Sequence, residues 1–412
     1  MKEQIEHKND FSYISFCHPR EICYFCSGNS QKMDISKHKF IILGSDHSNT
    51  LGQIRCLGEI GIRPIVIITE KHPYIINKSK YIGEYHIVDT IYDGPKYVLE
   101  HYCNEEFPPF IYTDRDDIMC AIDDYYDEIK GKFIFWNAGQ KGKIRQLINK
   151  EEQMDLAKKC GLNVIPTEHV KRGEMPQKLQ YPIFTKAINS LNPFWKSNAF
   201  ICNNTEELKT AYNKMGIEEV LLQKYISKKD EMPIEGISID CGREVKLLVK
   251  KSSIRFADNG FGIYSKLSIF HDDELENKVT NLMRNAGYTG IFEIEFIIDE
   301  DGTAYFMEVN FRNTMFNHAC ADYGVNILHL FANSVLNNHI DQIDEKKLNK
   351  EHTVMYEFDD LKLSVIQNKL SIWRWLKDFI STDSFLYIDK HDMAPFWSFL
   401  YFNIKNVIKK LT

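Results

Sequence analysis

The sequence predicts an α/β protein with α+β character: a small doubly wound N-terminal domain, a mixed region with hairpins, and a C-terminal helical segment. Two patterns predict this class. Between residues 39 and 148, apolar strands alternate with helical segments, which is typical of a parallel sheet covered by helices. After residue 150, strands follow one another across short turns, which indicates antiparallel pairing.

The composition indicates a globular protein of more than one domain. The chain has 412 residues, of which 43% are hydrophobic and 26% charged, enough to build apolar cores. Its formal net charge of −7 argues against a protein that binds nucleic acid by neutralising phosphates. The N-terminus lacks the apolar stretch of a secretory signal and the ten cysteines are ordinary usage, so we expect reduced thiols and a cytoplasmic location.

The first domain is expected over residues 39–148, after an N-terminal extension over residues 1–38. Apolar strands at 39–45 and 64–69 flank a helical segment, and this order predicts a β-α-β unit with parallel strands. The same alternation continues with strands at 85–89, 110–114 and 133–137 and with helices at 97–103 and 118–129.

The N-terminal extension contains a C-x-x-C pair, Cys23 and Cys26, with Cys17 and His18 upstream. These four side chains are candidate zinc ligands. No second pair stands at the spacing of a zinc site, so an irregular extension without a metal is the favoured interpretation.

A second domain is expected over residues 149–340, followed by a C-terminal segment over residues 341–412. Helices are expected at 151–160 and, with one apolar stripe, at 273–286, because each pattern ends at a glycine. A further helix is expected after Asn203 as its cap, with Glu206 in the first turn. The predicted strands between these helices are 163–167, 181–187, 198–202, 219–226, 236–240 and 245–250.

Residues 290–312 carry the most informative pattern. Two strands flank the turn sequence Asp-Glu-Asp-Gly at 299–302, which predicts an antiparallel hairpin. Because side chains alternate between faces, one face is apolar and the other carries acids. Pairing Glu295 with Glu308 places Asp299 opposite Ala304 and sets two carboxylates side by side.

The acidic face of this hairpin predicts a magnesium site, because Mg²⁺ takes hard oxygen ligands together with phosphate oxygens and water. The alternative is an ordinary solvated face of a sheet. That alternative accounts for Glu293 and Asp299, which we interpret as structural. It explains poorly why one short strand brings Glu308, Asn310 and Arg312 to the same face. The predicted metal ligands are Glu295, Glu308 and Asn310.

These motifs, E-I-E-F at 293–296 and M-E-V-N-F-R at 307–312, resemble the metal-binding end of the ATP-grasp superfamily. In that family an acid and an E-x-N-x-R motif hold two Mg²⁺ ions against the phosphates of the nucleotide. The resemblance covers residues 39 to about 340. It implies a two-lobed ATP-grasp domain, with ATP and two Mg²⁺ ions, or Mn²⁺, as cofactors.

The resemblance also implies nucleotide-binding residues upstream of the hairpin. Lys150 resembles the first nucleotide lysine, and Lys186, after a Tyr-Pro pair and an apolar strand, resembles the second. Lys150 opposes the macrodipole of the helix that it begins, and Lys186 ends an apolar strand and needs a counter-charge. Residues 223–226 resemble the hinge whose backbone reads adenine, and Glu231 stands at the ribose-binding position. The implied nucleotide contacts are Lys150, Lys186, Lys196, Gln223, Lys224, Tyr225, Ile226 and Glu231.

One segment departs from the family pattern. The family covers the phosphates with a glycine-rich loop, because glycine lets backbone amides approach closely. The corresponding residues 187–198 contain no glycine, and we expect Lys196 to bind phosphate there together with the polar Ser190, Asn192 and Ser197. A nucleotide-binding scaffold that has lost catalytic turnover is therefore the alternative to an enzyme.

Within the superfamily, the sequence resembles the carboxylate-amine ligases of the D-aspartate ligase group. Its C-terminal sequence at 387–400 is similar to their D-P-x-P-F ending, with Met393 in place of the first proline. The resemblance implies that a carboxylate, such as an amino acid, attacks the γ-phosphate to give an acyl phosphate, and that an amine then forms an amide. The implied catalytic residues are Arg312, Lys251 and Arg255. The sequence names neither substrate and gives no oligomeric state.

The C-terminal segment ends in an aromatic helix at 396–411 that carries Lys405, Lys409 and Lys410. Such a helix either lies on a membrane surface or docks on the core of its own protein, and docking is the favoured interpretation. The longest apolar stretches are far shorter than the roughly 20 residues of a membrane span.

Overall fold

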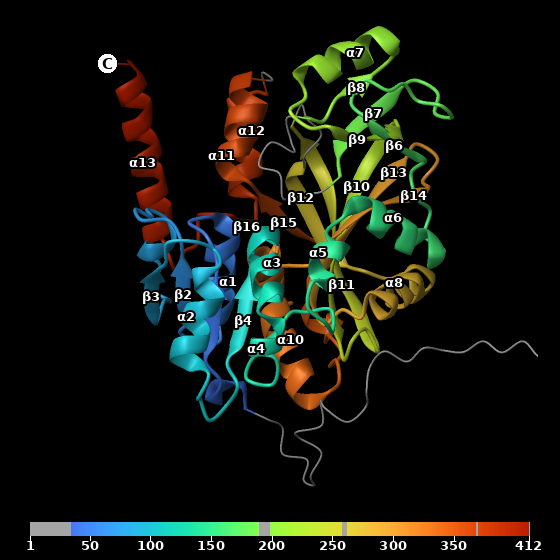
Figure 1. Ribbon diagram of the computed structural model, residues 1–412. Coiled ribbons are helices and arrows are strands. Elements are labelled where there is room, and N and C mark those ends of the chain that lie inside the picture. Colours follow the sequence, from blue (N-terminus) through green and yellow to red (C-terminus); the bar gives the residue numbers. More distant parts are fainter. Residues whose placement is uncertain (1–33, 189–197, 258–261, 368–369, 412) are drawn as a thin grey trace, which may run out of the picture. The chain divides into compact units, whose positions relative to one another are not determined.

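The structure is a computed structural model that describes residues 34–188, 198–257, 262–367 and 370–411 (Figure 1). Several sequence-based predictions lie outside these residues: the candidate zinc ligands Cys17, His18, Cys23 and Cys26, the nucleotide contact Lys196, and most of the glycine-free loop.

The N-terminal sheet has five parallel strands in the order β3-β2-β1-β4-β5. Side chains of β1 alternate between two cores: Phe40 and Ile42 pack with α1, whereas Ile41 and Leu43 pack with α2 and α3. Strands buried on both faces explain why the sequence shows continuous apolar runs here. The elements are β1 (Phe40–Leu43), α1 (Ser48–Glu59), β2 (Ile65–Ile68), β3 (Glu84–Ile87), α2 (Asp93–Tyr102), β4 (Phe110–Thr113), α3 (Asp116–Asp124), α4 (Tyr126–Ile129) and β5 (Ile134–Phe135). The predicted doubly wound arrangement is confirmed.

A four-stranded antiparallel sheet follows, in the order β6-β9-β7-β8. Two local predictions are displaced. The strand predicted at 163–167 begins only at Thr167. The helix predicted to be capped by Asn203 is capped by Asn204 instead, whose side chain accepts a hydrogen bond from the backbone amide of Glu207 rather than that of Glu206. The elements are α5 (Lys143–Leu147), α6 (Lys150–Lys159), β6 (Thr167–Lys171), β7 (Ile183–Ala187), β8 (Ile201–Cys202), α7 (Thr205–Lys214) and β9 (Glu219–Lys224).

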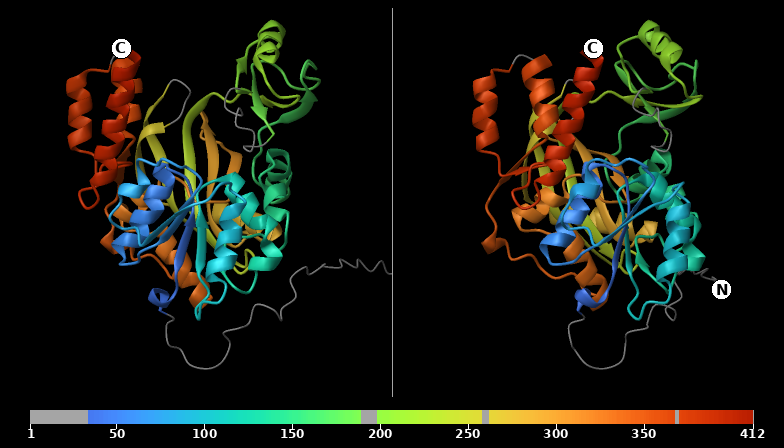
Figure 2. Two further views of the ribbon diagram at one scale, coloured as in Figure 1. Left: turned by 60° about the vertical axis from the view of Figure 1, so that its left-hand side comes forward. Right: turned by 90° about the vertical axis from the view of Figure 1, so that its left-hand side faces the viewer.

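The third sheet has seven strands in the order β14-β13-β10-β11-β12-β15-β16 (Figures 1 and 2). α8 packs against β11 through the stripe of buried residues that the sequence predicts, and Gly287 ends this helix in a left-handed conformation (φ 67°). The elements are β10 (Lys228–Ile239), β11 (Glu244–Phe256), β12 (Gly262–Ile269), α8 (Asp273–Ala286), β13 (Gly290–Asp299), β14 (Ala304–Asn310), α9 (Asn317–Tyr323) and α10 (Ile327–Asn337).

The C-terminal segment contributes strands as well as helices, because β15 and β16 extend the large sheet. In α13, Phe399 stacks on Tyr387 and Phe402 on Tyr74, with ring centroids 4.2 and 3.8 Å apart, whereas Trp397 stays exposed. The helix therefore docks through one side. In the part of the chain that the structure describes, every helix is too short or too polar to cross a bilayer. The elements are β15 (His352–Met355), α11 (Glu357–Asp360), the π-helix η5 (Leu361–Gln367), α12 (Ile372–Ile380), β16 (Ser384–Phe385) and α13 (Ala394–Leu411), and the short 3₁₀ helices are η1 (Ile35–Lys37), η2 (Ile76–Lys78) and η4 (Glu345–Lys347).

The β13–β14 hairpin has the predicted pairing of Glu295 with Glu308. The predicted pairing of Asp299 with Ala304 is wrong, because Ala304 pairs with Ile298 instead. The physical reason is a bulge: the register shifts after Glu295, so Phe296 pairs with Phe306 and Met307 is left without a partner strand residue. The bulge turns Phe306 into the apolar core and leaves the acidic pair in register.

Candidate active site

Acidic and amide side chains gather on one face of β13 and β14. Asn310 Nδ2 donates hydrogen bonds to Glu295 Oε1 at 2.8 Å and to Glu293 Oε1 at 3.2 Å. Glu308 lies directly opposite Glu295 across the hairpin. The three predicted metal ligands Glu295, Glu308 and Asn310 are thus neighbours, and the carboxylate oxygens of Glu295 and Glu308 are hard ligands that suit Mg²⁺.

Two lysines from other elements face these carboxylates. Lys150 is the first residue of α6, which Asn149 caps, and its buried side chain forms an ion pair with Glu308. Lys186 extends from β7, where burial and then the charge of Lys150 lower its pKa to about 8. The carboxylates of Glu308 and Glu295 act in the opposite direction on this pKa. Both predicted nucleotide lysines therefore share one electrostatic environment with the predicted metal ligands.

The paired carboxylates differ in charge. Burial raises the pKa of Glu308, but the ammonium groups of Lys150 and Lys186 outweigh burial and hold it well below its usual range. Burial raises the pKa of Glu295 well above its usual range, and the neighbouring charges of Glu293 and Glu308 add to this effect. A cation that binds both side chains therefore displaces a proton from Glu295.

Beneath this pair lies a second layer of ionisable groups: Glu235, which sequence reasoning missed, Glu293, which it treated as structural, and Lys251, which the resemblance implies as catalytic. Glu235 on β10 is 3% exposed, accepts a hydrogen bond from Thr314 Oγ1, and faces Glu293 on β13. Burial raises the pKa of Glu235 to about 7. Lys251 on β11 is 4% exposed, and its Nζ lies 3.8 Å from the ring centroid of Phe316. Burial lowers the pKa of Lys251, although the negative charge of Glu293 acts in the opposite direction.

Arg312 connects this cluster to the N-terminal sheet. Its Nη2 donates to Asn310 Oδ1 at 3.2 Å, and its Nε donates to Asp116 Oδ1 at 2.7 Å. Asp116 begins α3 just after β4, and the nearby buried Asp114 accepts a hydrogen bond from Thr50 Oγ1 at 2.9 Å. These residues follow β1 and β4, the pair of strands at which the order of the parallel sheet reverses. Such a switch point is where ligands bind in open α/β sheets.

Comparison with known proteins extends these observations. No protein-family model matches the sequence. The chain is 25% identical over 288 residues to the small subunit of 2-oxoglutarate carboxylase from Hydrogenobacter thermophilus. The match covers 63% of this chain and 58% of that protein. It therefore spans little more than half the length of this relative.

Solved structures share the arrangement of sheets. N5-carboxyaminoimidazole synthetase from Staphylococcus aureus superposes with a TM-score of 0.60 at 17% identity, covering 82% of this chain and 88% of that one. L-amino acid ligase from Bacillus licheniformis gives 0.56 at 16% identity, with coverages of 77% and 78%. The biotin carboxylase domain of the H. thermophilus 2-oxoglutarate carboxylase, solved with MgADP, ADP and bicarbonate, gives 0.56 at 18% identity, with coverages of 76% and 73%. The chain has an ATP-grasp fold.

The predicted adenine segment of the ATP-grasp fold joins β9 to β10. Gln223 is buried and donates from Nε2 to Thr167 Oγ1 at 2.9 Å. The amides of Lys224 and Tyr225 donate to the carbonyls of residues 166 and 182, so neither is directed at a ligand here. Ile226 follows, half-buried. Adenine contacts from this segment would use its carbonyl groups or its side chains.

The predicted ribose contact of the ATP-grasp fold, Glu231, lies on β10 and is half-buried. Its Oε1 accepts a hydrogen bond from Lys228 Nζ at 2.6 Å. The carboxylate also contributes to the electrostatic environment of Lys186 and Lys251, which places it beside the lysines of the cluster.

Arg255 lies apart from the lysines and carboxylates that gather on β13 and β14. Its Nε and Nη2 donate to the two oxygens of Asp360 at 2.7 and 2.8 Å, and its Nη1 donates to Asp378 at 2.9 Å. Register shifts on both sides of Arg255 interrupt the alternation that runs through Lys251. Of the implied catalytic residues, Arg255 therefore lies apart from Lys251 in the described structure, and it links β11 to the C-terminal segment.

Proposed function

We propose that this protein is an ATP- and Mg²⁺-dependent ligase that activates a carboxylate as an acyl phosphate and joins it to an amine. One observation carries this proposal above the others: Lys150 and Lys186 face the pair formed by Glu295 and Glu308. Phosphoryl transfer depends mainly on positioning and on charge stabilisation, and this arrangement brings groups for both into one place.

The side chains of Glu295, Glu308 and Asn310 would hold Mg²⁺, which neutralises the phosphates of the bound nucleotide. Lys150 and Lys186 would bind phosphate oxygens. The pKa of Lys186 is lowered because burial and Lys150 both disfavour its charge, so a phosphate restores the charged form of this lysine.

The carboxylate substrate would lie between the metal ligands and the second layer of the site. Arg312 and Lys251 are the cations on this side, and their attraction for an anion offsets the like charge of nucleotide and substrate. A carboxylate oxygen attacks the γ-phosphorus of ATP, the bond between this phosphorus and the β,γ-bridging oxygen breaks, and ADP leaves. The amine nitrogen then attacks the acyl carbon, phosphate leaves, and the nitrogen loses a proton.

Two resemblances support a carboxylate as the substrate. The solved L-amino acid ligase shares the fold, and the C-terminal sequence resembles that of carboxylate-amine ligases. The sequence relative is named a carboxylase subunit, and this name favours bicarbonate as a second candidate for the activated acid.

The experiment that tests this function measures ADP and phosphate release with amino acids, each paired with peptides or amino sugars, and with bicarbonate alone. Hydroxylamine is added to trap an acyl phosphate as a hydroxamate. We expect release that depends on one carboxylate and a hydroxamate of that acid. Release that depends only on bicarbonate favours the carboxylase function, and ATP binding without release under any condition favours the scaffold.

A further inference from the structure

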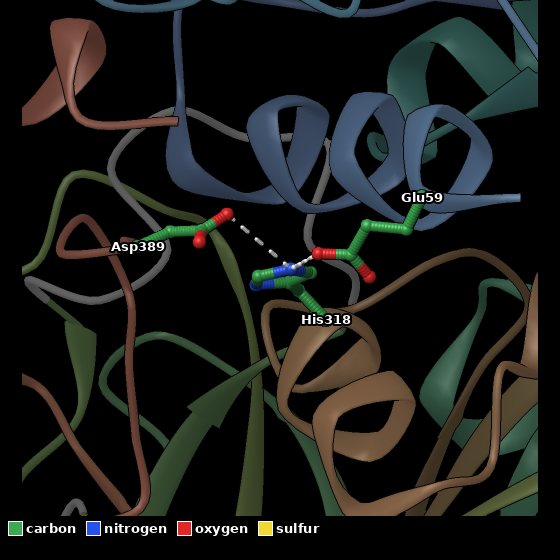
Figure 3. Close-up of side chains that lie close together, drawn as sticks. All are labelled: Glu59, His318 and Asp389. Atoms are coloured by element: carbon green, nitrogen blue, oxygen red, sulfur yellow. Dashed lines mark hydrogen bonds and ion pairs between the residues drawn. The ribbon is translucent and has the colours of Figure 1, made fainter. Parts of the chain in front are cut away.

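A second group of ionisable side chains lies outside the cluster of lysines and carboxylates already described. His318 Nε2 lies 2.9 Å from Glu59 Oε1 and 3.9 Å from Asp389 Oδ2, and the three atoms lie within 4.8 Å of one another. Figure 3 shows the three side chains directed toward one another. Glu59 ends α1, His318 belongs to α9, and Asp389 precedes α13, so three segments that are distant in the sequence meet here.

We propose that Glu59, His318 and Asp389 bind a divalent transition-metal ion, with Zn²⁺ as the expected ion. This site is independent of the proposed ligase function. An imidazole nitrogen and two carboxylate oxygens form a ligand set that suits Zn²⁺, and a water completes a tetrahedral site. Zinc–ligand bonds of about 2.0–2.1 Å place ligand atoms about 3.3–3.5 Å apart. The observed 2.9 and 3.9 Å lie on either side of that separation, so small movements of the side chains are sufficient.

Asp389 supplies the observation that points to a ligand. Its Oδ2, in a side chain that is 7% exposed, accepts no hydrogen bond from the described residues, although it lies 3.5 Å from Arg55 Nε. The donors of Arg55 are directed elsewhere: Nε to Asp392 Oδ2 at 3.3 Å, and the terminal nitrogens to three backbone carbonyls. A buried carboxylate oxygen without a donor is costly, and a metal ion directly removes that cost.

The charge in this region favours a cation with two positive charges. Glu59, Asp389 and Asp392 carry three carboxylates, whereas Arg55 supplies one guanidinium. The side chain of Glu59 is 27% exposed and those of His318 and Asp389 are 6% and 7% exposed, so two of the three proposed ligands are buried and the third reaches solvent. The alternative without a metal is an ordinary ion pair between protonated His318 and Glu59.

The metal would also fix the position of α9 beneath the candidate active site. Asn317, the residue before His318, directs its Nδ2 toward Glu235 Oε2 at 3.5 Å. One helix turn therefore reaches the second layer of the active site and the proposed zinc ligands together. The ion would tie this turn to α1 and to the segment before α13.

The test measures zinc content and thermal stability of the full-length chain with Cys23→Ser and Cys26→Ser, because these cysteines are themselves candidate zinc ligands. After incubation with Zn²⁺ and removal of unbound metal, we expect one equivalent per chain and a higher unfolding temperature. Glu308→Gln, which impairs the proposed magnesium site, should leave both results unchanged.

His318→Ala should lose the bound zinc and the thermal shift. Glu59→Gln tests the same site at a partly exposed helix end, where the amide keeps a hydrogen bond to His318 and the fold is retained. Glu100→Gln, at an exposed position on α2, is the matched control and should bind zinc as the parent does. Zinc retained by Glu59→Gln, or absent from the parent chain, would overturn the proposed site and leave the ordinary ion pair.

Discussion

Lys150, the first residue of α6, forms an ion pair with Glu308 in β14, and the two side chains are only 8% and 17% exposed. A lysine expected to bind phosphate therefore contacts a carboxylate expected to bind metal. This pairing keeps the pKa of Glu308 well below its usual range despite burial, so the carboxylate is charged at neutral pH. Binding of a magnesium nucleotide would give each partner a new ligand of opposite charge, Mg²⁺ for Glu308 and phosphate for Lys150.

Glu308→Gln should lower Mg²⁺-dependent ATP turnover by on the order of a hundredfold or more, because it removes a charged metal ligand while keeping its shape. Turnover is measured as ADP release at saturating Mg²⁺. The matched control is Glu300→Gln, in the exposed turn of the same hairpin, which should keep the parent rate. A Glu308→Gln rate within about threefold of the parent would contradict the metal assignment.

Lys186 should make nucleotide binding depend on pH. Because its pKa is about 8, the lysine loses its proton as the pH rises from 7 to 9, and only the protonated form attracts phosphate. We expect the affinity for ATP, measured by titration calorimetry, to fall over this range. Lys186→Met should bind ATP more weakly at pH 7 and lose this pH dependence. Lys209→Met, at an exposed position on α7, should behave like the parent, and an unchanged affinity in Lys186→Met would count against the phosphate role.

Glu235 should reduce stability at high pH. Its pKa is about 7 in the folded protein and near 4.5 when unfolded, so the folded state holds a proton that the unfolded state releases between these values. The free energy of unfolding therefore falls as the pH rises through this window. Glu235→Gln removes the buried charge and should be more stable than the parent at pH 8 by on the order of 2–3 kcal/mol.

The measurement for Glu235 is urea unfolding of the parent protein and of Glu235→Gln, in a chelating buffer at pH 5 and at pH 8. Most of the difference should appear only at the higher pH. Equal differences at the two pH values would show that ionisation of Glu235 does not control stability.

The pairing of Glu295 with Glu308 could be predicted from the sequence, because the alternation of the hairpin fixes which face is apolar and the turn at 299–302 sets the register. The bulge at Met307 could not be predicted from the sequence. A strand with one extra, unpaired residue has the same kinds of side chains as a regular strand, so the sequence carries no sign of it. As a result, the predicted partner of Ala304 was wrong although the acidic pair nearby was right.

The second layer of the site shows a different limit. Glu235 lies in the apolar stretch Met-Pro-Ile-Glu-Gly-Ile-Ser-Ile, and an acid in such a stretch is a signal of a buried functional group that could have been used. Its partners Glu293, Thr314 and Asn317 come from β13, from the connection after β14 and from α9, and nothing local in the sequence specifies those contacts. The large-scale alternation of strands and helices was sufficient for the N-terminal sheet, because parallel strands need long crossover connections, and these appear in the sequence as helical segments between apolar strands.

Arg255 gives the sharpest contrast between sequence and structure, and its role can be tested directly. The resemblance implies a catalytic arginine, whereas the structure pairs it with Asp360, which is 0% exposed and also accepts hydrogen bonds from Trp375 Nε1 and Ser364 Oγ. Arg255→Met leaves this carboxylate without its cation. We expect a loss of about 3 kcal/mol in the free energy of unfolding, with partial rescue in Arg255→Lys.

Turnover separates the two roles of Arg255. Well below the unfolding transition, ADP release per folded molecule should stay within about twofold of the parent for Arg255→Met, because the guanidinium lies in the ion-pair network of the C-terminal segment. Lys251→Met is the contrasting variant. It removes a buried cation beside Glu293 and should lose turnover. If Arg255→Met instead unfolds like the parent but loses turnover, the arginine acts on substrate, and its contacts with Asp360 and Asp378 are secondary.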